Sequence, residues 1–207
     1  MDLYFKALPE GTMCFKDEKL SGVKKAKERL TALLTANMNG SDKRKHFVIG
    51  KSAKPRCFKG VKSLPVVHKA NKNAWMTAQL FEDWLKDFDR EMDKNNRKVC
   101  LLLDNCSAHY VDTSNLKATE LVFLPPNTTS VIQPLDQGII RNFKHYYRSS
   151  MLQKVIGKID SDDSLTAREV AKNINVLDAV HDISSAWKRV GAETIQNCFF
   201  PRINTRG

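Results

Sequence analysis

Two aspartates stand where side-chain carboxylates can share a metal ion. Asp104 directly follows the apolar run Val99–Leu103, and Asp136 follows a proline-containing turn within Gln133–Gly138. Carboxylates at the C-terminal edge of a sheet and at the start of the following helix can converge, and hard divalent cations prefer oxygen ligands. Two such ions about 4 Å apart support phosphoryl transfer. Because an aspartate after a strand also serves as a helix cap or turn residue, the spacing alone leaves both interpretations open.

Apolar runs bounded by turn residues predict the strands that position Asp104. Two runs, Lys98–Leu103 and Glu120–Leu124, are uninterrupted, and a Pro-Pro pair stops the second. Continuous runs of this kind are typical of strands covered on both faces, as in a parallel or mixed sheet. Earlier in the chain, Thr31–Gly40 and His46–Lys51 predict a hairpin.

Helical periodicity occurs in the sequence both before and after the two predicted strands at residues 98–103 and 120–124. Apolar residues spaced three and four apart predict an amphipathic helix over residues 77–95, and further helices from Gln137 and over Ala167–Val190. We interpret the acids of the first helix as a solvated face: Glu82, Asp83, Asp87, Asp89, Glu91 and Asp93. The tryptophans have apolar neighbours, so we expect them to pack in the core rather than to stack on nucleic-acid bases: Trp75, Trp84 and Trp187. A helix followed by two strands that a connection joins is an order of elements typical of α/β proteins.

The cysteines and the apolar runs exclude several classes of protein. Five cysteines without a CxxC pair indicate neither a disulfide framework nor a structural zinc site, so we expect reduced and mostly buried thiols. Cys106 lacks a histidine base on its own turn and is not expected to be a nucleophile. The apolar runs fall short of the roughly 20 residues of a membrane span. We expect a soluble, intracellular protein without a signal peptide or a membrane partner.

The net charge of +11 is concentrated in one stretch. Residues 16–62 hold 14 Lys and Arg against four acids, and the rest of the chain is nearly neutral. Such a stretch is expected of a polyanion binder, because each neutralised phosphate releases condensed counterions. A solvated basic face that only aids solubility shows the same pattern, so the charge alone does not distinguish nucleic-acid binding from this alternative.

The motifs together resemble the DDE endonuclease domain of the Tigger/pogo transposases and of proteins derived from them, among them the jerky and centromere-binding protein B groups. The matching blocks are Leu3–Pro9, Lys24–Asn39, Lys51–Phe58, Leu101–His109, Phe123–Ser130, Gln133–Gly138, Ala186–Trp187 and Asn197–Phe199. So many blocks in one order cover nearly the whole chain. The resemblance implies an α/β fold with an RNase H-like mixed sheet flanked by helices.

The resemblance also implies the domain layout. The family's first strand and first acid precede the residues that match Leu3, so we expect a core truncated in its first strand. We place this endonuclease-type core at residues 1–157 and a helical C-terminal extension, packed on the core, at residues 158–207. An empty interior strand position would expose the edges of its neighbours.

By the same resemblance, Asp104 is the second metal-binding acid and Asp136 the third, with 31 residues between them. Asn105 and His109 would support the metal-bound carboxylates, although each also suits a plain structural role. The first acid has no counterpart in register, because Asp2 lies one position before the matching leucine rather than four. Loss of one of three carboxylates weakens the binding of the two Mg²⁺ or Mn²⁺ ions that an active enzyme would use; an inactive one would need no cofactor.

We therefore expect a nuclear, transposase-derived domain that binds the phosphate backbone of DNA with little sequence specificity and is catalytically impaired. Two alternatives stay open: an active Mg²⁺-dependent endonuclease or strand transferase with a substitute third acid, and a non-enzymatic protein-interaction scaffold. A homodimer is also left open. The residues predicted to contact phosphates are Lys24, Lys25, Lys43, Arg44, Lys45, Lys51, Lys54, Arg56, Lys59 and Lys62.

Overall fold

The computed structural model describes residues 1–8, 28–126, 128 and 132–200. The chain forms two compact units. The first contains Met1–Thr35, Arg44–Ala74 and Asn142–Val190, and the second contains Ala36–Lys43, Trp75–Arg141 and Gly191–Gly207. Within the described residues, no helix is both long and apolar enough to cross a membrane.

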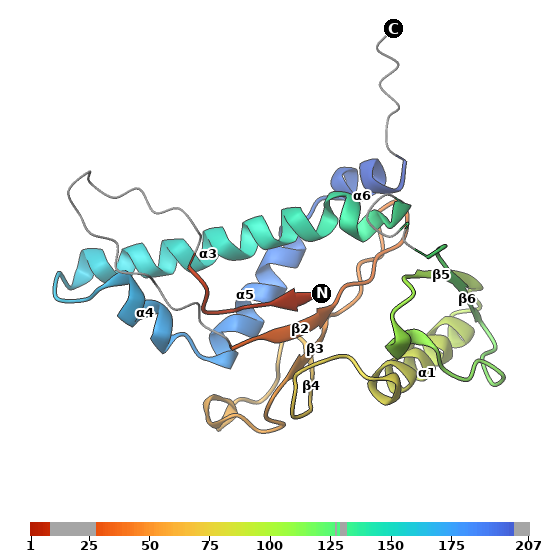
Figure 1. Ribbon diagram of the computed structural model, residues 1–207, viewed down its shortest axis with the longest axis horizontal. Coiled ribbons are helices and arrows are strands. Elements are labelled where there is room, and N and C mark those ends of the chain that lie inside the picture. The colour runs from red at the N-terminus through yellow and green to blue at the C-terminus, as the bar shows by residue number, and fades with distance from the viewer. Residues whose placement is uncertain (9–27, 127, 129–131, 201–207) are drawn as a thin grey trace, which may run out of the picture. The chain divides into compact units, whose positions relative to one another are not determined.

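The first unit is built on a mixed four-stranded sheet with the order β1-β2-β3-β4 (Figure 1). β1 (Asp2–Leu3), β2 (Leu30–Leu33) and β3 (Phe47–Gly50) pair antiparallel, and β4 (Val67–Ala70) pairs parallel to β3. The predicted hairpin is confirmed as the β2-β3 pair. A short 3-10 helix, η1 (Arg56–Phe58), lies in the connection that joins the parallel strands.

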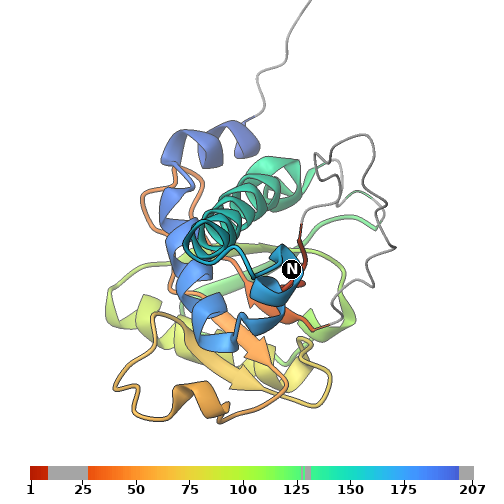
Figure 2. The same cartoon turned by 90° about the vertical axis from the view of Figure 1, so that its left-hand side faces the viewer.

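Two long helices pack on this sheet. Tyr147 of α3 (Ile140–Ser161) is buried, and its hydroxyl donates to the Phe5 carbonyl at 3.0 Å. Trp187 of α5 (Val176–Arg189) meets the buried His46 ring edge-on at 5.6 Å. The Lys154 ammonium, 2.5 Å from the buried Asp182 carboxylate, joins these two helices, which lie side by side in Figure 2.

The single helix predicted over Ala167–Val190 is two helices, α4 (Ala167–Asn173) and α5. Ile174 and Asn175 have extended backbone, which ends the first helix. The Asn175 side chain then accepts hydrogen bonds from the next turn's amides, and Asp178 accepts from the Asn175 amide. This capping box restarts the helix, and the apolar periodicity continues across the break.

The second unit packs α1 (Ala78–Lys94) on a two-stranded parallel sheet of β5 (Val99–Leu103) and β6 (Thr119–Phe123). The predicted helix and both predicted strands are confirmed, and so is the α/β class. Buried side chains at the centre of this layer are Phe81, Leu85 and Leu103. The second unit also holds the π-helix η3 (Leu135–Ile139), which leads into α3, and α6 (Ala192–Phe199).

Three burial predictions are wrong. The strands are not covered on both faces, because Leu102 and Val122 are 41% and 37% exposed. The four described cysteines are not buried: Cys100 and Cys106 are exposed, and Cys57 and Cys198 are partly covered, whereas Cys14 lies outside the described residues. Trp75 is 51% exposed rather than a core anchor. An apolar run fixes a strand but does not say whether a second layer covers its outer face.

Candidate functional site

Asp104 lies where the sequence places it, immediately after β5 in the second unit. Its carboxylate is 2.7 Å from Nδ1 of His109 and accepts a hydrogen bond from the Cys106 amide at 3.3 Å. A short 3-10 helix, η2 (Ser107–His109), turns the chain back so that this contact can form. The hydrogen bond from His109 holds the pKa of Asp104 below its ordinary value, although partial burial acts in the opposite direction.

His109 and Asn105 both hold this turn in place. The His109 ring packs on Phe81, with a centroid distance of 4.6 Å. The Asn105 amide donates to the Leu124 carbonyl beyond β6, and its oxygen accepts from the Tyr110 hydroxyl at 2.8 Å. These contacts give both residues a structural role, and their predicted support of a metal-bound carboxylate stays a prediction.

Asp136 lies at the second position of η3 and is exposed. Its amide donates to the Gln133 carbonyl at 3.0 Å, which starts the turn. Gly138 interrupts the regular helical geometry, and a Cβ there would lie 3.0 Å from the Cys198 sulfur of α6. The segment that carries Asp136, the predicted third acid, therefore packs closely against α6.

The described carboxylates do not fit a two-ion site, because no three His, Cys, Asp or Glu side chains among the residues that the structure describes gather closely enough to hold a metal ion. Asp2, the substitute considered for the missing acid, belongs to the first unit, where it accepts a hydrogen bond from the Thr31 hydroxyl at 2.9 Å. Arg29 lies 3.6 Å from the same carboxylate. We therefore derive no metal-dependent step from this arrangement.

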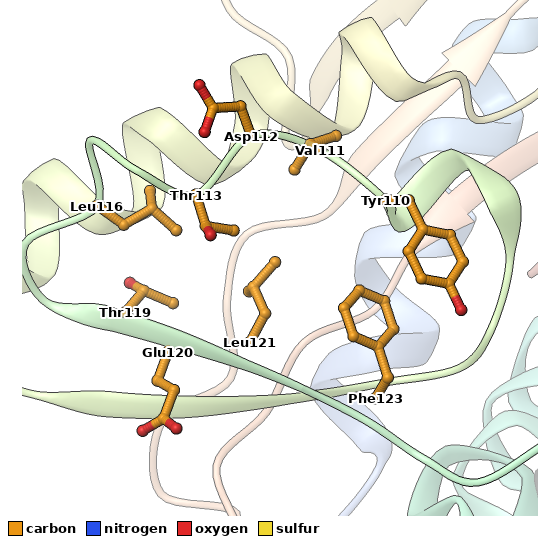
Figure 3. Close-up of a pocket in the computed structure, with 9 residues that line it drawn as sticks. All are labelled: Tyr110, Val111, Asp112, Thr113, Leu116, Thr119, Glu120, Leu121 and Phe123. Atoms are coloured by element: carbon orange, nitrogen blue, oxygen red, sulfur yellow. The ribbon is translucent and has the colours of Figure 1, made fainter.

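A cavity of about 660 Å³ lies in the second unit between the loop after η2 and β6 (Figure 3). Leu121 and Phe123 point into it, whereas the Asp112 and Glu120 carboxylates point away. Neither Asp104 nor Asp136 lines this cavity. Its apolar wall and acidic rim do not suit a phosphate.

The predicted phosphate-contacting residues gather mainly in the first unit. We call residues 51–66, which join β3 to β4, the cationic connection. It contains five exposed cations and no acid, and none of the five forms an ion pair within the described residues: Lys51, Lys54, Arg56, Lys59 and Lys62. Phe58 meets the ring of His68 edge-on at 5.0 Å, which anchors η1 to β4.

The other predicted cations are less uniform. Lys45 is exposed and Arg44 is partly buried, both in the first unit. Lys43 is partly buried in the second unit, and this burial lowers its pKa. Lys24 and Lys25 lie outside the described residues. The cationic connection is therefore the part of the predicted surface that the structure defines best.

The solvated-face interpretation is wrong for Asp89. This α1 carboxylate is only 6% exposed and accepts hydrogen bonds from the Lys117 and Ala118 amides at 3.0 and 2.8 Å. It thereby fixes the chain just before β6. Its position, four residues after Leu85 and three before Met92, puts it on the apolar stripe, and that spacing is the signal that could have identified it.

The chain is an α/β protein with a mixed sheet and helices, with one acid after a strand and another at the start of the segment that leads into a long helix. The chain belongs to the DDE superfamily endonuclease family, whose pattern matches residues 27–199. This confirms the predicted family, and the fold is consistent with an RNase H-like domain.

Individual relatives support the same assignment. The chain is 39% identical to Tigger transposable element-derived protein 4 of Mus musculus over 93% of its own length and 36% of the relative's. It is 35% identical to major centromere autoantigen B of Homo sapiens, over 85% of this chain and 28% of the relative. It is 30% identical to the jerky protein homolog of Homo sapiens, over 95% of this chain and 34% of the relative. The chain thus spans about a third of the length of these relatives. No solved structure matches it.

Proposed function

We propose that this transposase-derived domain binds DNA through its phosphate backbone, with little sequence specificity, and that its DDE site is catalytically impaired. The observation that carries the proposal is the cationic connection, with five exposed cations and no acid on one connection of the first unit. Neutralisation of phosphates by these side chains would release condensed counterions and drive binding.

The composition of the connection favours backbone contact over base recognition. Its one aromatic side chain, Phe58, is partly buried against His68 and is not presented as a stacking platform. Lysine, which makes up four of the five cations, acts as a point charge toward phosphate. We therefore expect affinity to depend on charge and salt more than on DNA sequence.

Impaired catalysis is supported by the set of acids that the chain supplies. Two-ion catalysis needs carboxylates that converge on both metal ions. Two residues, Asp104 and Asp136, match the family's metal-binding acids, and among the described residues no three His, Cys, Asp or Glu side chains gather closely enough to hold a metal ion. The names of two relatives refer to a transposable element and to the centromere, and we propose a nuclear location by analogy with them.

The test is the salt dependence of DNA affinity, measured by fluorescence anisotropy on two duplexes of unrelated sequence. The test variant replaces Lys51, Lys54, Arg56, Lys59 and Lys62 with Ser. The control variant replaces five other exposed cations, so that the net charge changes equally: Lys72, Lys86, Arg90, Lys94 and Lys117.

We expect the slope of log affinity against log salt to flatten by about 0.9 for each lost phosphate contact, and so by about 4.5 when all five contacts are lost in the test variant. The control should retain most of the slope, and the wild type should bind both duplexes within a few-fold. Equal losses in the two variants would reject the cationic connection as the contact surface. Salt-independent binding would favour the scaffold alternative.

A further inference from the structure

The cationic connection is folded and anchored by contacts inside the first unit. The Phe58 amide donates to the Pro55 carbonyl at 2.9 Å. The Lys59 amide donates to the Arg56 carbonyl at 3.2 Å. The Phe58 ring meets His68 of β4 edge-on at 5.0 Å, and η1 also lies beside α5. The connection therefore presents its cations from an ordered backbone.

A tight turn forms the tip of this connection. Lys59 has φ −61° and ψ 125°, and Gly60 has φ +81°. The Val61 amide donates to the Phe58 carbonyl at 3.1 Å, which closes a type II turn with glycine at its third position. Lys59 and Gly60 are exposed, and no described atom outside the chain neighbours lies within 4 Å of a Cβ built on Gly60. The tip is therefore narrow, with the long side chain of Lys59 beside a residue that has none.

Cations flank the turn on both sides. Arg56 precedes it and Lys62 follows it, and both are exposed. Between them, Phe58 and Val61 are partly buried, so the apolar side chains turn toward the protein and the charged ones toward solvent. In Figures 1 and 2 the connection is drawn in light orange and projects beyond β3 and β4. A projecting turn with a cation at its tip and one on each side suits a groove bordered by two rows of phosphates.

We propose that the Lys59–Gly60 turn binds in the minor groove of duplex DNA. The Lys59 side chain enters the groove, and Arg56 and Lys62 contact phosphates of the two strands that border it. This inference rests on the proposed DNA binding and specifies how the cationic connection performs it. The minor groove is about 6 Å wide, whereas the major groove, about 12 Å wide, admits a helix or a two-stranded ribbon. A single lysine beside a glycine fits the narrower groove, because glycine lets the backbone approach closely.

This placement predicts a preference for a narrow minor groove rather than for a base sequence. Tracts of A·T pairs have such a groove, and its negative potential attracts inserted Lys and Arg side chains. A G·C pair instead places the N2 amino group of guanine in the minor groove. We therefore expect the protein to bind A·T duplexes a few-fold more tightly than G·C duplexes, and we expect Lys59 to cause the difference.

Competition binding to three duplexes of equal length tests which groove is contacted. The 207-residue chain is compared on A·T, G·C and inosine–cytosine duplexes. Inosine lacks the guanine amino group in the minor groove but keeps the G·C pattern in the major groove. We expect the inosine duplex to bind like the A·T duplex. If it binds like the G·C duplex, or if all three affinities are equal, the groove proposal is wrong while salt-dependent DNA binding stands. Absence of binding to every duplex would reject both proposals.

Single substitutions compare Lys59 with a matched position. Lys59→Ser should abolish the preference for the A·T and inosine duplexes, and Lys59→Arg should keep it. Lys51→Ser, the control, removes the same charge from an exposed position of the same connection outside the turn. Both Ser variants should flatten the salt slope by about 0.9, but Lys51→Ser should retain the preference. A preference that survives in Lys59→Ser, or that Lys51→Ser also loses, would reject the turn as the groove contact.

Discussion

Asp89 is a buried carboxylate whose charge stabilises the second unit. Burial alone would raise its pKa, but hydrogen bonds from the Lys117 and Ala118 amides outweigh this and hold the pKa below its ordinary value. The two amides precede β6, so the carboxylate fixes the register in which that strand joins β5. The ionised form is the one that both amides recognise.

Replacement of Asp89 by Asn should therefore destabilise the protein. The neutral amide has one acceptor oxygen for two buried donors, so we expect a loss of about 2 kcal/mol in the free energy of unfolding. Asp87→Asn is the control, because that side chain is 76% exposed on the same helix. Urea denaturation followed by circular dichroism measures both. Equal, small effects of the two substitutions would contradict the role given to Asp89.

The same carboxylate predicts a pH dependence with a defined sign. A folded-state pKa below the unfolded value of about 3.8 means that the contribution is fully present above that pH. It is lost as the pH falls through the folded pKa. Over this acidic range the stability difference between wild type and Asp89→Asn should shrink. A difference that stays constant down to the acid transition would show that the charge of Asp89 is not the stabilising feature.

For single residues, sequence patterns predicted where a side chain lies in the fold better than they predicted which side chains it contacts. The end of an apolar run located Asp104 correctly, because strand ends are marked by polar turn residues. The same pattern could not show that His109 would occupy the Asp104 carboxylate, since that contact depends on the 3-10 turn between them. Asp89 was misread because a charge on a helix usually means solvent, and its buried amide partners lie 28 and 29 residues away.

Among the elements, the turn at Gly40 shows how closely segments pack in the second unit. Gly40 has φ +70°, and a Cβ there would lie 2.6 Å from Cα of Ala192 at the start of α6. The Gln196 side chain also donates to the Asn39 carbonyl at 3.0 Å. The turn and the helix therefore approach too closely for any side chain at position 40.

Gly40→Ala should destabilise the protein by more than its backbone conformation alone explains. Gly60 has φ +81° with nothing within 4 Å of an added Cβ, so Gly60→Ala reports the conformational cost by itself, about 1 kcal/mol. Gly40→Ala should cost about 1–3 kcal/mol more because of the clash. Thermal denaturation compares the two. Similar melting temperatures would mean that α6 moves away readily.

The capping box of α5 gives a second element-scale prediction. Asn175→Ala removes the acceptor for the Leu177 and Asp178 amides and should lower the free energy of unfolding by about 1 kcal/mol. Asn173→Ala, at an exposed position near the end of α4, is the control. An effect of Asn175→Ala no larger than that of the control, in chemical denaturation, would argue that packing alone sets the start of α5.

The elements were predicted well where periodicity is strong, as for α1 and the β2-β3 hairpin. The break between α4 and α5 was missed because the apolar spacing continues through it, while the cap depends on two polar side chains. The exposed outer face of β5 was missed for another reason. An uninterrupted apolar run indicates that both faces of a strand could be buried. The exposed side chain of Leu102 shows that, among the described residues, no second layer covers the outer face of β5.

For the whole molecule, the two predicted activities belong to different units. The cationic connection lies in the first unit, and Asp104 and Asp136 lie in the second. The family and the α/β class followed from the order of motifs, which depends on no single residue. The sequence could not show which cations stay unpaired and exposed, because that depends on how each segment packs.

The central claim is that the domain retains DNA binding while its acid set is incomplete. Incubation of supercoiled plasmid with the folded 207-residue chain and Mg²⁺ or Mn²⁺, beside an Asp104→Asn/Asp136→Asn variant, tests this most directly. We predict that both proteins retard the plasmid in a gel and that neither nicks it in a metal-dependent way. Metal-dependent nicking by the wild type that is lost in the double variant would contradict the account.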